Sequence, residues 1–312
     1  VDEKVIAFDE AGQRRWTFVS EMDPEVFRAA KQYWFKSAPG HEGIHGLYTG
    51  TLIEGGTQLF VGSACTLEIL DGDGRLVKRL PVFWGTGAVF AIVPGPDNTR
   101  NLLIGRSITD GAHLAIVNSK TLTVVGSGYH GVPTGATYVG GWASMSRDHL
   151  FYEDLDGDGV REVASEINGT WNRISVWRAD GTPLYNASFG PGDSIPAKNL
   201  RDVDIADLDG DGKKEILTAT AGGLVVALDH QCRKVWARRL PSPPTVLQAV
   251  ATPAGARVVA GCQDGSVVVL DGQGLPIQRD AVSGAPTRIT ALEGSLVVLA
   301  TERGEVKAFR LP

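Results

Sequence analysis

A short, apolar segment that ends in a polar turn recurs along the whole chain, and this repeat constrains the fold more than any other feature. Seven copies begin near residues 5, 67, 114, 174, 225, 267 and 306, and residues 225–229 (VVALD) and 267–271 (VVVLD) are typical of them. Many follow an earlier strand-like run, and several precede a basic or aromatic one such as residues 234–237 (KVWA). Strands and turns with a period of about 40 to 60 residues are typical of four-stranded sheets repeated around an axis.

We therefore expect an all-β fold, with residues 1–312 forming a single β-propeller domain of four-stranded antiparallel blades. Because the first copy lacks the two strands that should precede it, the count is either seven blades with the first incomplete, or six with one spare strand. We favour seven, since residues 1–5 resemble the second half of a hairpin. A chain that begins at Val1 without Met is expected to be a processed or excised piece, with further domains in a larger protein.

One segment interrupts the repeat. Asp23 followed by Pro24 is typical of a helix start, and Pro39-Gly40 is typical of a stop. We expect a short helical insertion over residues 23–36, between the first two blades.

Two acidic segments share one pattern, residues 154–162 (DLDGDGVRE) and residues 207–215 (DLDGDGKKE). Carboxylates at loop positions 1, 3, 5 and 9, with a carbonyl at position 7, form a set of hard oxygen ligands that suits Ca²⁺. The predicted ligands are Asp154, Asp156, Asp158, Val160 and Glu162 in the first loop, and Asp207, Asp209, Asp211, Lys213 and Glu215 in the second.

The alternative for any such segment is a solvated Asp-Gly hairpin turn. That alternative suits residues 71–74 (DGDG) and Asp271-Gly272, where the third acid is absent. Both acidic loops lack the Glu at position 12 of a helix-loop-helix site and run directly into an apolar strand. We expect a structural strand-loop-strand calcium site between the first and second strands of a blade.

The two acidic loops resemble the FG-GAP/VCBS repeats of integrin-α-like propellers, in which the matching carboxylates bind calcium. Residues 4–18 (KVIAFDEAGQRRWTF) and 223–240 (GLVVALDHQCRKVWARRL) are similar to PQQ-like propeller repeats. The resemblance implies a propeller and an extracytoplasmic location, secreted or periplasmic. It does not imply a quinone cofactor.

The composition of the chain argues against several classes of partner and site. A net charge of −6 argues against nucleic acid, which needs a basic surface. Three cysteines without metal-ligand spacing suggest neither a disulfide scaffold nor a zinc site, and no apolar run reaches the length of a membrane span. We expect a monomer.

Polar and aromatic residues gather in the expected loops of blades two to five, on one face of the propeller. Aromatic rings stack on sugars and arginines bind carboxylates, so this pattern predicts a site for carbohydrate, and for acidic polysaccharide in particular. The predicted ligand-binding residues are Trp84, Trp142, Glu166, Asn168, Trp171, Asn172 and Asn199.

Three functions remain open: a carbohydrate-binding module of a carbohydrate-processing system, a polysaccharide lyase acting on uronate-containing chains, and a protein-interaction platform. A lyase needs a base, an acid and a group that stabilises the carboxylate. The base would be His41, His45 or His130, the acid Tyr48 or Tyr138, and the carboxylate would bind Arg106 and Arg201 with Asn172.

Overall fold

The computed structural model describes residues 3–33, 43–106, 114–129, 145–169, 172–190, 199–293 and 295–312. By its internal contacts the chain divides into two compact units. The first comprises residues 1–152 and 177–183, and the second comprises residues 153–176 and 184–312.

The first half of the described chain holds the single α-helix of the described part and strands β1 to β10. These elements are β1 (Lys4–Phe8), β2 (Arg14–Val19), α1 (Pro24–Tyr33), β3 (Ile44–Gly50), β4 (Gln58–Leu70), β5 (Leu76–Pro94), a 3-10 turn η1 (Pro96–Asn98), β6 (Arg100–Arg106), β7 (Leu114–Asn118), β8 (Val124–Gly128), β9 (Met145–Ser146) and β10 (Leu150–Glu153).

The second half consists of strands joined by short turns. They are β11 (Glu162–Gly169), β12 (Arg173–Arg178), β13 (Pro183–Ser188), β14 (Leu200–Ala206), β15 (Glu215–Thr220), β16 (Leu224–Leu228), β17 (Lys234–Arg239), β18 (Pro244–Thr252), β19 (Gly255–Cys262), β20 (Ser266–Asp271), β21 (Pro276–Ala281), β22 (Pro286–Leu292), β23 (Leu296–Thr301) and β24 (Val306–Arg310).

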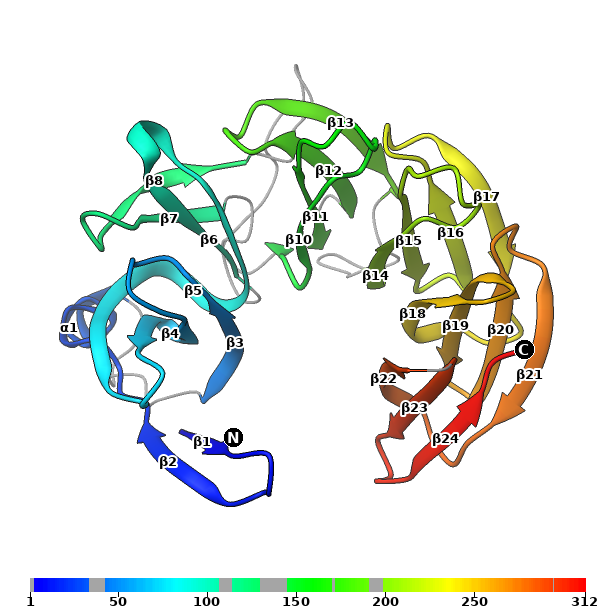
Figure 1. Ribbon diagram of the computed structural model, residues 1–312, viewed down its shortest axis with the longest axis horizontal. Helices are drawn as coiled ribbons and strands as arrows, with labels where there is room; N and C mark the ends of the chain where they lie inside the picture. The colour runs from blue at the N-terminus through cyan, green and yellow to red at the C-terminus, as the bar shows by residue number, and fades with distance from the viewer. Residues whose placement is uncertain are drawn as a thin grey trace. The chain divides into compact units, whose positions relative to one another are not determined.

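Consecutive strands pair with one another, as expected for propeller blades. Sheets β14-β15-β16-β17 and β18-β19-β20-β21 are four-stranded antiparallel meanders (Figure 1). Strands β10 to β13 follow in the same order, with β9 also paired to β11. The shorter sheets are β1-β2 at the start of the chain and β22-β23-β24 at its end.

Strands β3 to β8 form one six-stranded sheet. It contains two blade-like repeats, because different parts of the long strands β4 and β5 pair with different neighbours. Residues 58–63 of β4 pair with β3, whereas residues 66–70 pair with the first part of β5. Cys65, at φ 48°, separates the two parts of β4. The second part of β5 pairs with β6.

All seven repeat copies predicted from the sequence are strands. They lie in β1, in residues 66–70 of β4, and in β7, β12, β16, β20 and β24. The sequence repeat therefore marks one equivalent strand in each sheet repeat, and the all-β prediction is confirmed.

In the second unit, two hydrophobic clusters lie between neighbouring sheets. Leu217 and Val225 of one sheet pack in the same cluster as Val258 and Leu270 of the next. A second cluster joins β18–β20 to β22 and β23, through residues such as Val259 and Leu299. Burying a Val or Leu side chain contributes about 1.5–3 kcal/mol relative to leaving it exposed, so these contacts stabilise the stacking of one sheet on another.

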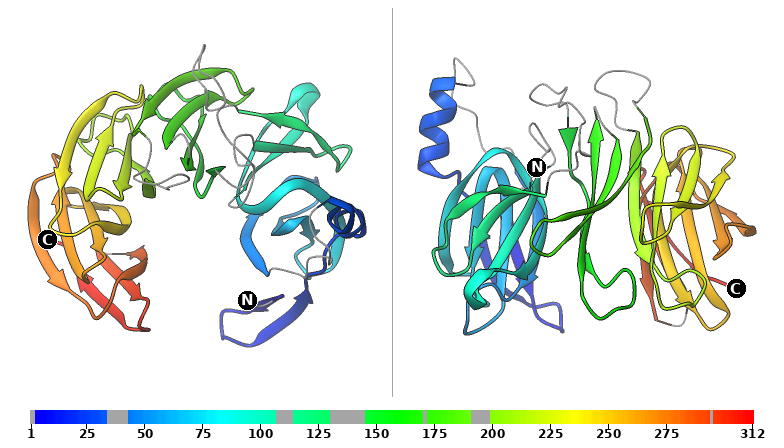
Figure 2. Two further views of the ribbon diagram at one scale, coloured as in Figure 1. Left: turned by 180° about the vertical axis from the view of Figure 1, so that it is seen from behind. Right: turned by 90° about the horizontal axis from the view of Figure 1, so that it is seen from above.

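Helix α1 confirms the predicted insertion, and it ends at Tyr33 in the described part of the chain. Asp23 Oδ1 accepts a hydrogen bond from Glu25 N at 2.8 Å, which is the expected N-cap. Asp23 N donates to Thr66 Oγ1 at 3.1 Å and thereby ties the helix start to β4. Among residues 24–29 of the helix, Val26 is fully buried, whereas Phe27 is 46% exposed. Figure 2 (right) shows α1 projecting beyond the ends of the strands in its own unit.

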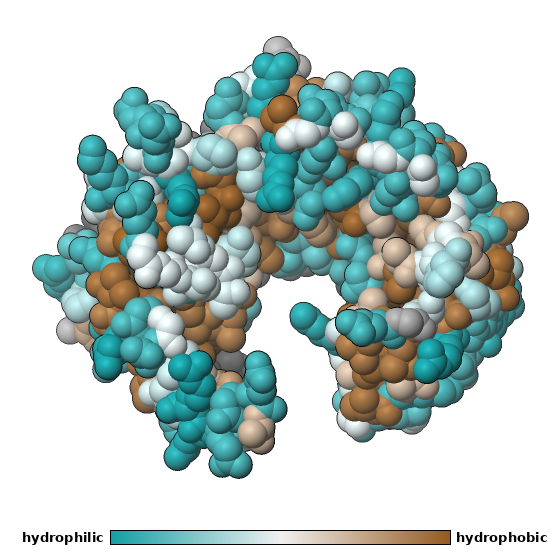
Figure 3. Space-filling model, in the orientation of Figure 1, coloured by the Kyte–Doolittle hydropathy of each residue, from teal (hydrophilic) through white to brown (hydrophobic). Residues whose placement is uncertain are grey.

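The last sheet exposes hydrophobic residues at the surface. Figure 3 shows hydrophobic residues exposed over β22 and β23, and Leu292 and Val306 are 48% and 69% exposed. The three cysteines are buried and form no disulfide. No helix within the described ranges is long and apolar enough to cross a membrane.

Candidate metal centre

The first acidic loop connects β10 to β11, and its own carboxylates hold its backbone in place. Asp154 accepts hydrogen bonds from Gly157 N at 2.8 Å and from Gly159 N at 2.9 Å. Asp156 Oδ1 accepts from Asp158 N at 3.2 Å. Glycine is needed here, because Gly157 and Gly159 both have φ near +80°, at 78° and 88°.

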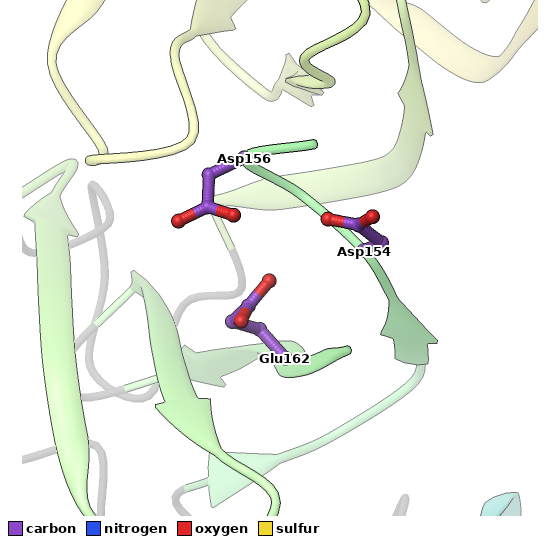
Figure 4. A group of neighbouring side chains, drawn as sticks. All are labelled: Asp154, Asp156 and Glu162. Atoms are coloured by element: carbon purple, nitrogen blue, oxygen red, sulfur yellow. The ribbon is translucent and has the colours of Figure 1, made fainter. Parts of the chain in front are cut away.

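Glu162, the first residue of β11, closes the loop from the opposite side. Its Oε2 accepts a hydrogen bond from Leu155 N at 3.0 Å, and the residue is only 8% exposed. One oxygen each from Asp154, Asp156 and Glu162 lie within 4.8 Å of one another, and Figure 4 shows the three carboxylates converging. Asp158 Oδ1 accepts from Val160 N at 2.7 Å.

The second loop, between β14 and β15, repeats this geometry. Asp207 accepts from Gly210 N at 2.7 Å and from Gly212 N at 3.0 Å, and Glu215 Oε2 accepts from Leu208 N at 2.9 Å. Oxygens of Asp207, Asp209 and Glu215 again lie within 4.8 Å of one another. Asp211 Oδ1 accepts from Lys213 N at 2.8 Å, as Asp158 does in the first loop.

In each acidic loop, the negative charges of the aspartates act on a buried glutamate. Burial, together with the three neighbouring aspartates, raises the pKa of Glu215 to about 6, against a partial lowering by the Leu208 hydrogen bond. The same causes raise the pKa of Glu162. A cation at the centre of either group would remove this repulsion.

The acidic groups have the dimensions of a calcium site. Oxygens that bind one Ca²⁺ lie 2.3–2.6 Å from it, so two of them are at most about 5 Å apart. The 4.8 Å limit within each group satisfies this condition. Each acidic cluster could hold a metal ion, and its ligands are carboxylates, which suit hard cations.

The three amides predicted to bind sugar form hydrogen bonds with backbone groups. Asn168 bonds both N and O of Leu200. Asn172, fully buried, accepts from Gly169 N and Asn199 N and donates to Gly190 O. Asn199 donates to Phe189 O at 3.0 Å. These contacts give all three amides a role in joining β11, β12 and β14.

Other predicted site residues lie in strands rather than in loops. Glu166 in β11 and Arg106 in β6 are buried, with exposed fractions of 1% and 3%. Tyr48 in β3 stacks near Phe60 and Phe90, with ring centroids 6.0 and 6.3 Å apart, and packs on the core of its sheet.

Among the predicted residues in the described ranges, His45 in β3 and Arg201 in β14 are exposed. The backbone of Trp84 lies in β5. Several candidates fall outside the described residues: His41, His130, Tyr138, Trp142 and Trp171.

Sequence reasoning missed two carboxylates that join neighbouring sheets. Asp202 Oδ2 accepts from Leu247 N, and Asp204 Oδ2 accepts from Ala249 N, both at 2.7 Å. The aspartates of β14 thus replace the backbone acceptors that a paired strand would offer to β18. Their spacing of two, just before the second acidic loop, was the available signal.

A buried aromatic cluster in the first unit was also missed. The Arg147 guanidinium lies 5.2 Å from the ring centroid of Trp177 and donates to Tyr129 O at 3.1 Å. Tyr129 meets Trp177 edge-on and donates its hydroxyl to Ala179 O. Desolvation raises the pKa of Tyr129, so this hydroxyl stays protonated as a structural donor.

Comparison with protein families agrees with this geometry. Residues 154–218, which span both acidic loops, match the model of the FG-GAP-like repeat. Over that segment, the chain is similar to an FG-GAP-like repeat. Residues 195–283 match a second model, the lambda-carrageenase beta-propeller domain. The PQQ-like part of the resemblance stays a prediction. Among curated proteins, no sequence matches the chain.

Solved structures show the fold. The Dos1 propeller is 14% identical, with a TM-score of 0.64 over 99% of this chain and 72% of that one. BamB from Moraxella catarrhalis is 18% identical, with a TM-score of 0.58 over 99% and 77%. The dihydro-heme d1 dehydrogenase NirN is 13% identical, with a TM-score of 0.66 over 99% and 59%. At such identities the likeness concerns the fold alone, which is a β-propeller.

Proposed function

We propose that the chain is a calcium-stabilised β-propeller that binds an acidic polysaccharide outside the cytoplasm, as a module of a carbohydrate-processing system. The calcium part is carried by one observation: both acidic loops hold a nearly buried glutamate against two aspartates with the same hydrogen bonds. A cation would balance the negative charge of such a convergent set of carboxylates.

Calcium suits these loops better than magnesium. The ligands come from an irregular loop whose shape is fixed by hydrogen bonds from its backbone N–H groups to its own aspartates. Ca²⁺ accepts six to eight oxygens in flexible geometry, whereas Mg²⁺ demands a near-ideal octahedron and keeps several waters. Asp154, Asp156 and Glu162 would hold one ion, and Asp207, Asp209 and Glu215 the other, with Asp158, Asp211 and the carbonyls of Val160 and Lys213 as further predicted ligands.

The carbohydrate part is supported by the match of residues 195–283 to the lambda-carrageenase propeller domain. Carrageenan is a sulfated polysaccharide, so the match favours an acidic glycan. Exposed arginines in that segment, Arg201, Arg239 and Arg279, offer positive charge to sulfate groups. Trp142 and Trp171 remain the predicted stacking residues.

Calcium binding is tested by titration calorimetry on protein stripped with a chelator. We expect two ions per chain, and none in the double variant Asp156→Asn/Asp209→Asn. Both substituted residues are exposed, and their amide oxygens can still accept from the backbone. The matched control Asp73→Asn changes an exposed acid in an Asp-Gly turn and should still bind two. Full binding by the double variant would place calcium elsewhere, and a wild type without binding would refute the calcium proposal.

Polysaccharide binding is tested by electrophoresis through gels that contain lambda-carrageenan or neutral dextran, with calcium present. We expect the carrageenan gel alone to retard the protein, and Trp171→Ala to abolish the retardation. Phe27→Ala, which changes an exposed aromatic on α1, is the control. Equal mobility in both gels would count against the glycan proposal.

Incubation with uronate-containing polysaccharides, with calcium and then with a chelator, addresses the lyase alternative. A β-elimination on uronate chains produces an unsaturated product that absorbs in the ultraviolet. A calcium-dependent rise in absorbance that His41→Ala or His130→Ala removes would make the chain a lyase. Binding to a protein partner, unaffected by those changes, would favour an interaction platform.

A further inference from the structure

The two acidic loops are in direct contact within the second unit. Lys214 N, in the second loop, donates a hydrogen bond to Leu155 O, in the first loop, at 2.9 Å. Lys214 Nζ also bonds Glu153 Oε2 at 2.9 Å, next to the first predicted ligand of that loop. A single residue therefore bonds the neighbouring loop through both its backbone and its side chain.

Each end of the backbone bond adjoins a predicted ligand. The peptide of Leu155 is held from its N–H side by the carboxylate of Glu162, at 3.0 Å. Lys214 directly precedes Glu215, whose carboxylate holds Leu208 N at 2.9 Å. The hydrogen bond from Lys214 N to Leu155 O therefore joins two residues that each adjoin the contacts of a predicted ligand glutamate.

The loops also pack too closely to move independently. A Cβ added to Gly157 would lie only 3.0 Å from Gly212 O, so the two glycine turns already touch. On the far side of the second loop, a Cβ on Gly272 would clash with Leu208 O. Fixing the backbone of one loop therefore restricts the backbone of the other.

We propose that the two loops bind calcium cooperatively, with Lys214 as the coupling residue. This inference rests on the proposed calcium function. The first ion further restricts the motion of its loop and of Leu155 O, the acceptor of Lys214 N, so the second loop has less conformational entropy to lose when its ion binds. The Lys214 ammonium pairs with Glu153 at 2.9 Å and adds a second contact between the two loops.

Single-loop variants measure the coupling by titration calorimetry. Asp156→Asn leaves only the second site, and we expect its dissociation constant to rise about fivefold or more above that of the same site in the wild type with its neighbour filled. Asp209→Asn should weaken the first site by the same factor, because coupling between two sites is reciprocal.

Two substitutions at Lys214 separate the contribution of its side-chain ion pair from that of its backbone hydrogen bond. Lys214→Met keeps the backbone N–H and removes only the ion pair with Glu153, so most of the cooperativity should remain. Lys214→Pro removes the donor to Leu155 O, and we expect two ions that bind without coupling. Circular dichroism checks its fold, and the single-loop variants alone decide the proposal if it fails to fold.

The outcomes distinguish the two proposals. A wild type that binds no calcium refutes the calcium function itself. Two ions whose affinities are unchanged in the single-loop variants would leave calcium binding intact and overturn the coupling. A remaining site that binds more tightly than before would show repulsion instead of cooperativity, and would also overturn it.

Discussion

The tetrapeptide Asp-Gly-Asp-Gly occurs three times, and the structure uses it in two different ways. At residues 71–74 it forms an exposed hairpin turn, in which Asp71 Oδ1 accepts from Asp73 N and Arg75 N, both at 2.9 Å. At residues 156–159 and 209–212 it forms the centre of an acidic group. In the turn, the Asp71 carboxylate accepts hydrogen bonds from the backbone of the turn itself. Each acidic loop instead brings three carboxylates close to one another.

The flanking residues decide between the two. Each acidic loop has a further aspartate two positions earlier and a glutamate at the start of the next strand, Glu162 or Glu215. Because that glutamate is 8% exposed and returns to the loop backbone, it adds a charge that solvent cannot screen. An acidic loop therefore differs from the exposed Asp-Gly turn by its buried glutamate. Four predictions test this difference.

The largest effect is expected for Glu215→Ala in calcium. The change removes a calcium ligand and leaves Leu208 N, in a residue 5% exposed, without its acceptor. A lost ion costs about 2.7 kcal/mol at a hundredfold excess over the dissociation constant, and an unsatisfied buried donor costs about 1–3 kcal/mol. Urea unfolding should show a total of about 4 kcal/mol, whereas Asp71→Ala should cost about 1 kcal/mol. Equal losses would show that the loops are ordinary turns.

Next in size is a pair of glycine changes at equivalent turn positions. Gly272→Ala places a Cβ against Leu208 O, so the backbone of the second acidic loop must shift, at a cost of about 1–3 kcal/mol. Gly72→Ala meets nothing within 4 Å and should change stability by less than about 0.5 kcal/mol. Thermal unfolding of both variants measures the difference. A neutral Gly272→Ala would mean that the turn and the loop are not in contact in solution.

A smaller effect is expected from pH in the presence of a chelator. The pKa of Glu215 rises from 4.5 to about 6 on folding, so between these values the folded chain keeps a proton that the unfolded chain releases. The free energy of unfolding should therefore fall as pH rises through this range. Calcium should reverse the trend, since it binds the ionised carboxylate. Urea unfolding at several pH values measures both slopes, and Glu215→Gln should flatten the first.

The smallest effect is expected for Asp73→Asn in the exposed turn. The change removes an ion pair with Arg75 at 3.0 Å, in which both side chains are more than half exposed. Such pairs contribute about 0–1 kcal/mol, and calcium should stabilise this variant as much as the wild type. A reduced calcium response in thermal melts would mean that this Asp-Gly turn also binds the ion.

The sequence predicted the repeat well, because alternating strands and turns are local features. All seven copies of the apolar segment are strands, and the Asp-Pro helix start at residue 23 is present. The predicted sugar-binding residues stay predictions, and two of them have backbone contacts that the sequence did not reveal. Asn168 and Asn172 are polar and occur near strand ends, yet their amides bond the backbone of another segment. Composition near a loop does not reveal which groups the fold itself uses.

Residue type and spacing alone determined the strand repeat, the two acidic loops and the carboxylates that converge in them, since each lies within a few consecutive residues. Only the tertiary structure decided which groups meet across the chain. The tertiary structure set the hydrogen bond from Lys214 N to Leu155 O. It also placed the carboxylates of Asp202 and Asp204, in β14, against backbone N–H groups of β18. These contacts depend on how one sheet packs against the next, and packing of that kind joins residues more than 40 positions apart.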